Sequence, residues 1–138
     1  MSLKINKMSS AYTSHKSQSA IYQKALEIFS LARHISTYLS QDLSYLHRNG
    51  REDTYIYFTG DIVQQSVSLG PQILKAESQV FSEEKHKYAA SVMRLSTLLY
   101  KNCLLLEHAN SNGKDFLPLL RKELKKFRQL QHTWRLTL

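Results

Sequence analysis

The sequence predicts an all-α fold, an antiparallel four-helix bundle with up-down-up-down order. Apolar residues recur every three or four positions in four long stretches, which is the period of an amphipathic helix. No useful length alternates with the period of two that a strand requires. The 138 residues include only 4 glycines and 2 prolines, so we expect few turns and long elements. Four such helices with short connections bury their apolar faces most simply against one another.

The first predicted helix begins near Ser19 and runs for about 28 residues. Its polar end at residues 47–51 contains Asn49-Gly50, the expected stop. The apolar positions of this helix are Ile21, Ala25, Ile28, Ala32, Ile35, Leu39 and Leu46. Residues 1–17 are rich in serine and lysine, and we expect them to form a flexible basic arm before a bundle domain at residues 18–138.

The second predicted helix begins near Asp53, whose side chain can cap exposed backbone amides. Its expected buried face consists of Ile56, Val63, Val67, Gly70 and Leu74, with Ile62, Ile73 and Phe58 beside it. Gly70-Pro71 lies inside this pattern, and proline removes one intrahelical donor and crowds the preceding turn. We therefore predict a kink within one helix. The alternative is two shorter helices separated at residues 69–71.

The third predicted helix starts at Ser82, a suitable N-cap, and places Glu83 and Glu84 where the helix dipole favours anions. Its expected apolar positions are Tyr88, Val92, Leu95, Leu99, Leu106 and Ala109. The polar residues 110–113 end it. The fourth helix is expected to begin between Asp115 and Pro118, since proline is tolerated in a first helical turn.

The apolar surface of the first and third helices is wider than the single face that a helix buries in a monomeric bundle. The surplus residues are Tyr22, Phe29, Leu98, Tyr100 and Leu105. Surplus apolar width is typical of a subunit interface, so we expect a homo-oligomer.

The net charge of +8 is concentrated at the two ends of the chain. Residues 1–17 hold three lysines and no acid, and residues 114–138 hold seven lysines and arginines with two acids. Between them, nine cations balance nine acids. This asymmetry favours nucleic acid, an acidic protein surface or an anionic membrane as a partner. The alternative is a basic helix face that serves only solubility.

The fourth helix carries an apolar stripe with a cationic stripe beside it. The apolar stripe is interrupted by Gln131 and consists of Leu117, Leu120, Leu124, Phe127 and Trp134. One residue along a helix is a rotation of about 100°, so the cations stay in water when the apolar stripe is buried. Cations three or four residues apart can contact several phosphates together. The predicted nucleic-acid-binding residues, called the basic ridge below, are Arg121, Lys122, Lys125, Lys126, Arg128, His132 and Arg135.

No motif in the sequence indicates catalysis or metal binding. Residues 83–86 contain one Glu-x-x-His, whereas a di-metal site in a helical bundle needs two copies and two further carboxylates. The six histidines lack a zinc spacing, and no glycine-rich phosphate loop or Gly-x-Ser-x-Gly motif is present. Cys103 lies inside an apolar helical run, which favours a core position over a nucleophile. We expect no metal, no cofactor and no enzymatic activity.

Three features of the sequence predict a soluble, cytoplasmic protein without a membrane partner. The amino terminus lacks the apolar segment of a secretory signal. The longest aliphatic run, at residues 104–106, is far shorter than the about 20 residues of a membrane span. A single cysteine forms no intrachain disulfide, so nothing indicates an oxidising compartment.

Four features in a fixed order point to a known family. They are the helix opening at residues 21–26, the aromatic-Thr-Gly-x-Ile start at residues 58–62, the aliphatic run ending at residues 73–76, and the closing Trp134. In this order they resemble the accessory variability determinant (Avd) proteins of diversity-generating retroelements. They also resemble the related four-helix proteins encoded in intervening sequences of bacterial large-subunit ribosomal RNA, which share a proline comparable to Pro71. The resemblance covers residues 19–136.

The resemblance implies a four-helix protomer assembled as a pentameric barrel with basic outer surfaces. It implies association with a retroelement reverse transcriptase and its template RNA, in support of mutagenic cDNA synthesis that diversifies a target gene. The matching basic surface would include Arg121, Lys125, Arg128 and Arg135. We therefore expect a non-enzymatic accessory protein that binds nucleic acid, RNA in the first place. The alternatives are a protein of the ribosomal-RNA branch, and a structural or partner-binding bundle with no nucleic-acid role.

Overall fold

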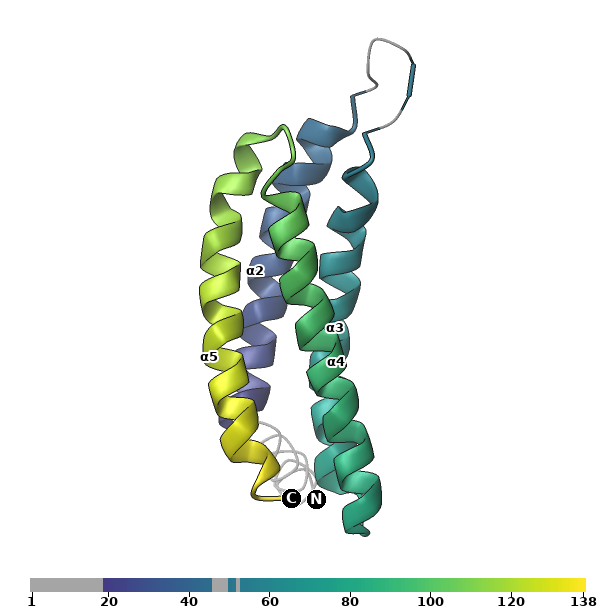
Figure 1. Ribbon diagram of the computed structural model, residues 1–138, viewed down its shortest axis with the longest axis vertical. Coiled ribbons are helices and arrows are strands. Elements are labelled where there is room, and N and C mark those ends of the chain that lie inside the picture. The colour runs from purple at the N-terminus through teal and green to yellow at the C-terminus, as the bar shows by residue number, and fades with distance from the viewer. Residues whose placement is uncertain (1–18, 46–49, 52) are drawn as a thin grey trace, which may run out of the picture.

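The computed structural model describes residues 19–45, 50, 51 and 53–138. These residues form four α-helices and one 3-10 helix, and none of them lies in a strand (Figure 1). The elements in chain order are α2 (Ala20–Leu43), α3 (Ile56–Ser78), α4 (Ser82–Leu106), the 3-10 helix η1 (Asn112–Phe116) and α5 (Leu117–Arg135). The prediction of an all-helical four-helix bundle is confirmed for this part of the chain. The predicted arm at residues 1–17 lies outside the described residues.

The four helices share one apolar core. In Figure 1, α3 lies beside α2 and α4, and α5 packs against α2 and α4. Every helix contributes fully buried side chains, among them Ile28, Ile62, Leu99 and Phe127. Burying each such side chain stabilises the fold by about 1.5–3 kcal/mol. Helices of this length depend on such packing because their intrinsic propensity alone leaves them marginal in water.

The start of α2 agrees with the prediction, whereas its end does not. The Ser19 hydroxyl accepts a hydrogen bond from the backbone N–H of Tyr22 at 3.3 Å, which caps the helix. The helix ends at Leu43, before the predicted stop at Asn49-Gly50. The Ser44 hydroxyl donates to the Gln41 carbonyl at 2.9 Å and so satisfies one carbonyl of the last turn. The predicted apolar position Leu46 lies outside the described residues.

α3 is one continuous helix through Pro71, so the alternative of two shorter helices is wrong. It begins at Ile56 and not at Asp53. Asp53 instead accepts a hydrogen bond from the backbone N–H of Tyr55 at 2.9 Å and stabilises the turn before the helix. The buried face is rotated by about one residue from the predicted one. Ile62 and Ile73, expected beside the face, are fully buried, whereas Val67 is exposed. Gly70 is buried as predicted.

Two buried hydroxyl groups explain this rotation. Thr59 Oγ1 donates to the Ile56 carbonyl at 2.6 Å, and Ser66 Oγ donates to the Val63 carbonyl at 2.8 Å. Ser36 of α2 in turn donates to the Thr59 carbonyl at 2.9 Å. A hydroxyl that bonds to a helix carbonyl loses little on burial, so small polar residues can occupy a helix interface. A pattern built from apolar residues alone therefore misplaced the face.

The N-cap of α4 lies one residue earlier in the chain than predicted. Phe81 is the N-cap and Ser82 is the first helical residue, so Ser82 does not cap the helix. Glu83 and Glu84 lie in the first turn as predicted. The buried residues of α4 are Ala89, Val92, Ser96, Leu99, Cys103 and Leu106. The prediction of a core position for Cys103 is confirmed.

The connection from α4 to α5 is held against α2. α4 ends at Leu106, and the Ser111 hydroxyl downstream donates to a carboxylate oxygen of Asp42 and accepts from the backbone N–H of Gly113 at 3.0 Å. A Cβ at Gly113 would lie 3.3 Å from the Leu39 backbone nitrogen, so glycine permits this close approach.

The last helix agrees with its prediction. α5 begins at Leu117 and carries Pro118 in its first turn. The five residues of the predicted apolar stripe are all buried: Leu117, Leu120, Leu124, Phe127 and Trp134. Among the helices in the described ranges, none has the length and apolar content to cross a bilayer.

Candidate nucleic-acid interface

The arginines of the basic ridge follow the seam between α5 and α4. Arg121, Arg128 and Arg135 are seven residues apart, which is close to two helical turns, so they share one side of α5. Their neighbours, in α4 or at its C-cap, are also seven residues apart and are met in the reverse order. The three pairs are Arg121 with Glu107, Arg128 with Tyr100, and Arg135 with Met93 across a shared groove.

The first arginine is neutralised by an acid. Arg121 Nε donates to Glu107 Oε1 at 2.8 Å, and both side chains are largely shielded from solvent. This hydrogen bond is the main reason that the pKa of Arg121 is raised further above its ordinary value, with a smaller contribution from Tyr100. Arg121 therefore belongs to the packing of α5 on α4, and of the predicted ridge it is among the least available to an external anion.

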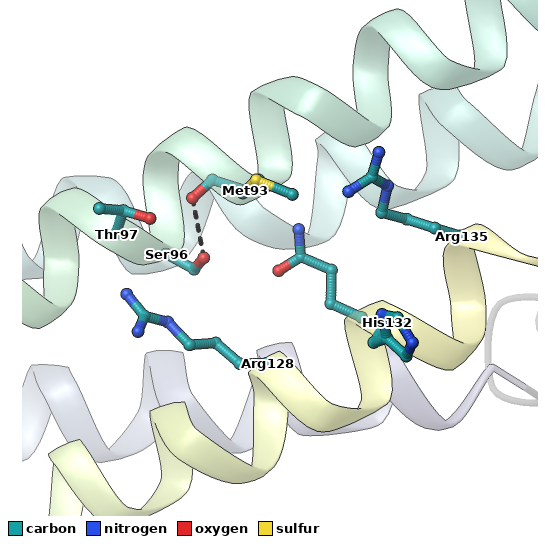
Figure 2. Close-up of a pocket in the computed structure, with 7 residues that line it drawn as sticks. Met93, Ser96, Thr97, Arg128, His132 and Arg135 are labelled. Atoms are coloured by element: carbon teal, nitrogen blue, oxygen red, sulfur yellow. Dashed lines mark hydrogen bonds between the residues drawn. The ribbon is translucent and has the colours of Figure 1, made fainter.

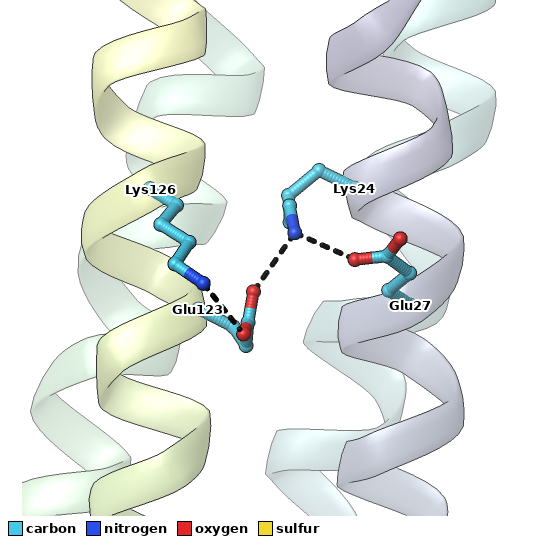
Figure 3. Close-up of polar contacts among 4 residues, drawn as sticks. All are labelled: Lys24, Glu27, Glu123 and Lys126. Atoms are coloured by element: carbon cyan, nitrogen blue, oxygen red, sulfur yellow. Dashed lines mark hydrogen bonds and ion pairs between the residues drawn. The ribbon is translucent and has the colours of Figure 1, made fainter.

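A second predicted ridge residue belongs to an ion-pair network between α5 and α2 (Figure 3). Lys126 Nζ lies 3.3 Å from Glu123 Oε1, and Glu123 Oε2 accepts from Lys24 Nζ at 2.9 Å. Lys24 also pairs with Glu27 at 2.6 Å. The hydrogen bond from Lys24 is the main reason that the pKa of Glu123 is lowered, and Lys126 lowers it further. Lys126 therefore shares its charge with an internal acid.

The other five ridge residues are exposed, and no acid pairs with them within the described part of the chain. They are Lys122, Lys125, Arg128, His132 and Arg135. The Arg128 guanidinium carbon lies 4.9 Å from the centre of the Tyr100 ring. This cation–π contact orients the guanidinium and consumes none of its N–H donors. Five of the seven predicted residues are thus exposed on α5 without an acidic partner among the described residues.

A groove of about 340 Å³ opens between α4 and α5 within this surface (Figure 2). Its lining consists of Met93, Ser96, Thr97, Arg128, Gln131, His132 and Arg135. In Figure 2, Arg128 and Arg135 project from α5 toward α4 on two sides of the groove. The Ser96 hydroxyl donates to the Met93 carbonyl at 2.9 Å, which ties it to its own helix. The lining includes cationic side chains and no carboxylate.

Sequence reasoning missed the part that Gln131 plays in this site. The pattern treated Gln131 only as an interruption of the apolar stripe, yet its side chain is buried and lines the groove. A polar residue at an otherwise strictly apolar position was the available signal. Trp134, by contrast, has a local structural role, since its indole N–H donates to Glu77 Oε2 at 3.0 Å and joins α5 to α3.

The other residues considered for catalysis or metal binding lie apart from this groove. Within the described ranges, no three side chains of histidine, cysteine, aspartate or glutamate gather closely enough to hold a metal ion. Glu83 and His86 are both exposed near the start of α4. Burial raises the pKa of the Cys103 thiol to about 12, which leaves it protonated near neutral pH.

The arrangement on α5 supplies positive charge and hydrogen-bond donors, and these bind an oxyanion through charge-assisted hydrogen bonds. Arginine suits phosphate in particular, because its planar fork matches two oxygens. Comparison of the chain with protein-family models, with curated proteins and with solved structures found no match.

Proposed function

We propose that this chain is a non-enzymatic accessory protein that binds nucleic acid through the exposed cations of α5. The observation that carries the proposal is the row of five basic-ridge residues with no acidic partner among the described residues. Side chains three or four residues apart on a helix are about 5–6 Å apart at Cβ, so one strand can meet several of them. Phosphate contacts of this kind attract and position nucleic acid without reading its sequence.

The finer part of the proposal is an Avd-type role. We propose that the protein associates with a retroelement reverse transcriptase and its template RNA, and that it acts as a pentameric barrel. The resemblance over residues 19–136 supports this role. Two apolar side chains of α4, Leu98 and Leu105, are 49% and 43% exposed, and an assembly that covered them would remove apolar surface from water.

We also infer the antiparallel up-down-up-down order of the helices. Three hydrogen-bonded pairs support the inference: Ser36 with Thr59, Gln65 with Asn102, and Glu107 with Arg121. Each pair joins the earlier part of one helix to the later part of its neighbour in the chain. Connections this short favour such an order over parallel neighbours.

The proposal is tested by reversing three exposed charges. The variant Lys125→Glu/Arg128→Glu/Arg135→Glu should lose binding to a fluorescently labelled single-stranded RNA, measured by anisotropy, with unchanged helical circular dichroism. For the unmodified protein, log affinity should fall linearly with log salt concentration, by about 0.7 for each phosphate neutralised on a single strand.

A matched control separates this surface from the total charge. Lys87, Arg94 and Lys101 are exposed residues of α4, and their reversal to glutamate changes the net charge by the same amount. The control should retain most of the binding. Equal losses in both triple variants would assign binding to overall charge, and unchanged affinity of the α5 variant would refute the proposed surface.

One observation favours a structural bundle with no nucleic-acid role. Arg121 and Lys126 form ion pairs with acids of the same chain, as basic residues of a purely structural helix would. No binding to RNA or DNA at low salt would support that candidate. A reverse transcriptase gene with paired template and variable repeats beside this gene would favour the retroelement role, whereas location within a ribosomal RNA insertion would favour the other branch.

A further inference from the structure

The starting observation is a buried amide without a partner. The Gln131 side chain is only 3% exposed, and its Nε2 is shielded from solvent with no hydrogen-bond acceptor in the described part of the chain. Buried polar groups are nearly always hydrogen-bonded, because a donor withdrawn from water and left unpaired loses its solvation. A leucine or isoleucine at this position of α5 would avoid that loss. The amide therefore needs another explanation.

The surroundings of Gln131 are rich in hydrogen-bond donors and include no carboxylate. Arg128 precedes it by three residues and Arg135 follows it by four, so all three lie along one side of α5 and line the same groove. His132 also lines the groove. Across the groove, Ser96 directs its hydroxyl proton to the Met93 carbonyl, and neither residue brings a negative charge.

The contrast with Arg121 sharpens this point. Two turns earlier in α5, the equivalent arginine meets Glu107, and an internal carboxylate completes the site. At the Arg128 and Arg135 positions, α4 offers an aromatic ring and a thioether instead of an acid. The seam therefore has one arginine position that is internally neutralised and two that are not, and the unpaired amide lies between these two.

We propose that the groove between α4 and α5 is a phosphate-binding site, in which Arg128 and Arg135 hold a phosphate group and the Gln131 amide donates to one of its oxygens. The terminal torsion of glutamine has a broad energy profile, so a small rotation brings the amide N–H groups to the ligand. The volume of about 340 Å³ leaves room for a sugar attached to the phosphate. Where the phosphate is the backbone of a nucleic acid, this inference rests on the proposed function. A free phosphate monoester carries the same chemistry.

The direct test is a nuclear magnetic resonance titration of the full chain. The Gln131 side-chain amide and the Nε–H signals of Arg128 and Arg135 are followed while inorganic phosphate, a ribonucleoside 5′-monophosphate and a short single-stranded RNA are added separately. We expect all three ligands to shift these signals. Shifts with the two small ligands but no RNA binding would support the site and refute the proposed function. RNA binding that leaves the Gln131 amide unchanged would refute the site and leave the proposed function intact.

Substitutions separate a ligand-binding role from a structural one. Gln131→Leu removes the donors and extends the apolar stripe, so it should raise the melting temperature and weaken phosphate binding about tenfold. Arg128→Ala and Arg135→Ala should each weaken it by at least about tenfold. Lys87→Ala, at an exposed residue of α4 that does not line the groove, should leave it unchanged. If Gln131→Leu and both arginine variants bound phosphate with the affinity of the unmodified protein, the inference would be overturned.

Discussion

At the residue scale, burial decides what a chemically capable side chain can do. Cys103 is the only cysteine of the chain and is fully buried in the core. Loss of solvation is the main cause of its raised pKa, the nearby Glu107 raises it further, and Arg121 opposes the shift. The thiolate is the reactive form, so a thiol with a pKa of about 12 is unreactive at neutral pH. The same principle makes the buried amide of Gln131 informative, since burial removes its option of bonding to water.

Cys103 should therefore report on unfolding. In the folded protein at about pH 8, where a free thiol of ordinary pKa is partly ionised, its reaction with a thiol-specific chromogenic reagent should be slower by orders of magnitude than in denaturant. The measurement is the rate of absorbance change with and without denaturant. A native rate close to the denatured rate would show that the thiol is reached without unfolding.

At the element scale, the seams between helices differ in chemistry. α2 and α3 meet through hydroxyl groups such as Ser36, which donates to the Thr59 carbonyl at 2.9 Å. α2 and α5 meet through the ion pair of Lys24 with Glu123, whereas α4 and α5 meet through the arginine positions of the basic ridge. Glycine allows another close approach, because a Cβ at Gly70 would lie 3.2 Å from the Tyr22 ring. Each seam thus restricts the rotation of one helix against another.

The Lys24–Glu123 pair predicts a pH dependence of stability. The pKa of Glu123 is lowered from its ordinary 4.5, so its contribution is fully present above about pH 4.5 and is lost as the pH falls through the lower folded-state value. The pKa of Lys24 is raised above 10.5, so its contribution is lost only as the pH rises beyond that value. Glu123→Gln should cost up to about 1 kcal/mol at neutral pH, because the pair is partly exposed.

This difference should shrink as the pH falls below about 4.5. The measurement is urea unfolding of both proteins at several pH values, with free energies from linear extrapolation. Asp61→Asn serves as the control, since Asp61 is exposed and forms no ion pair with the described residues. A cost of Glu123→Gln that stays constant into strong acid would contradict the assignment.

At the scale of the whole molecule, part of the apolar surface expected to form a subunit interface is buried within the protomer and part is exposed. Tyr22, Phe29 and Tyr100 are partly buried within the protomer, and Tyr100 lies beneath Arg128. Leu98 and Leu105 remain exposed on α4, seven residues apart and therefore on one side of the helix. Internal packing thus uses part of the surplus, and what remains is a narrower stripe.

This stripe leads to a prediction about assembly. The unmodified protein should be larger than a monomer in solution by light scattering coupled to size exclusion, and Leu98→Lys/Leu105→Lys should shift it toward a monomer. The helical circular dichroism signal should persist, because both side chains lie outside the core. An unmodified protein that is monomeric at all accessible concentrations would refute the predicted oligomer.

The amino-acid sequence by itself determined the number of α-helices among the described residues and the whole apolar stripe of α5. Helix periodicity and caps act over a few residues, as in the bond from the Tyr22 N–H to Ser19. These features are therefore visible in the order of residues alone. The faces of α3 were less visible because Thr59 and Ser66 bond to carbonyls of their own helix and tolerate burial.

Only the tertiary structure decided which cations stay free. Arg121 meets Glu107 from 14 positions earlier, and Glu123 meets Lys24 from 99 positions earlier. Such pairs depend on how each helix is rotated in the bundle, and packing across the seams sets that rotation. The same packing buried Gln131 beside a groove that two unneutralised arginines share. Local pattern could mark these residues as polar or basic, but the partners of a side chain are decided by neighbours that are distant in the chain.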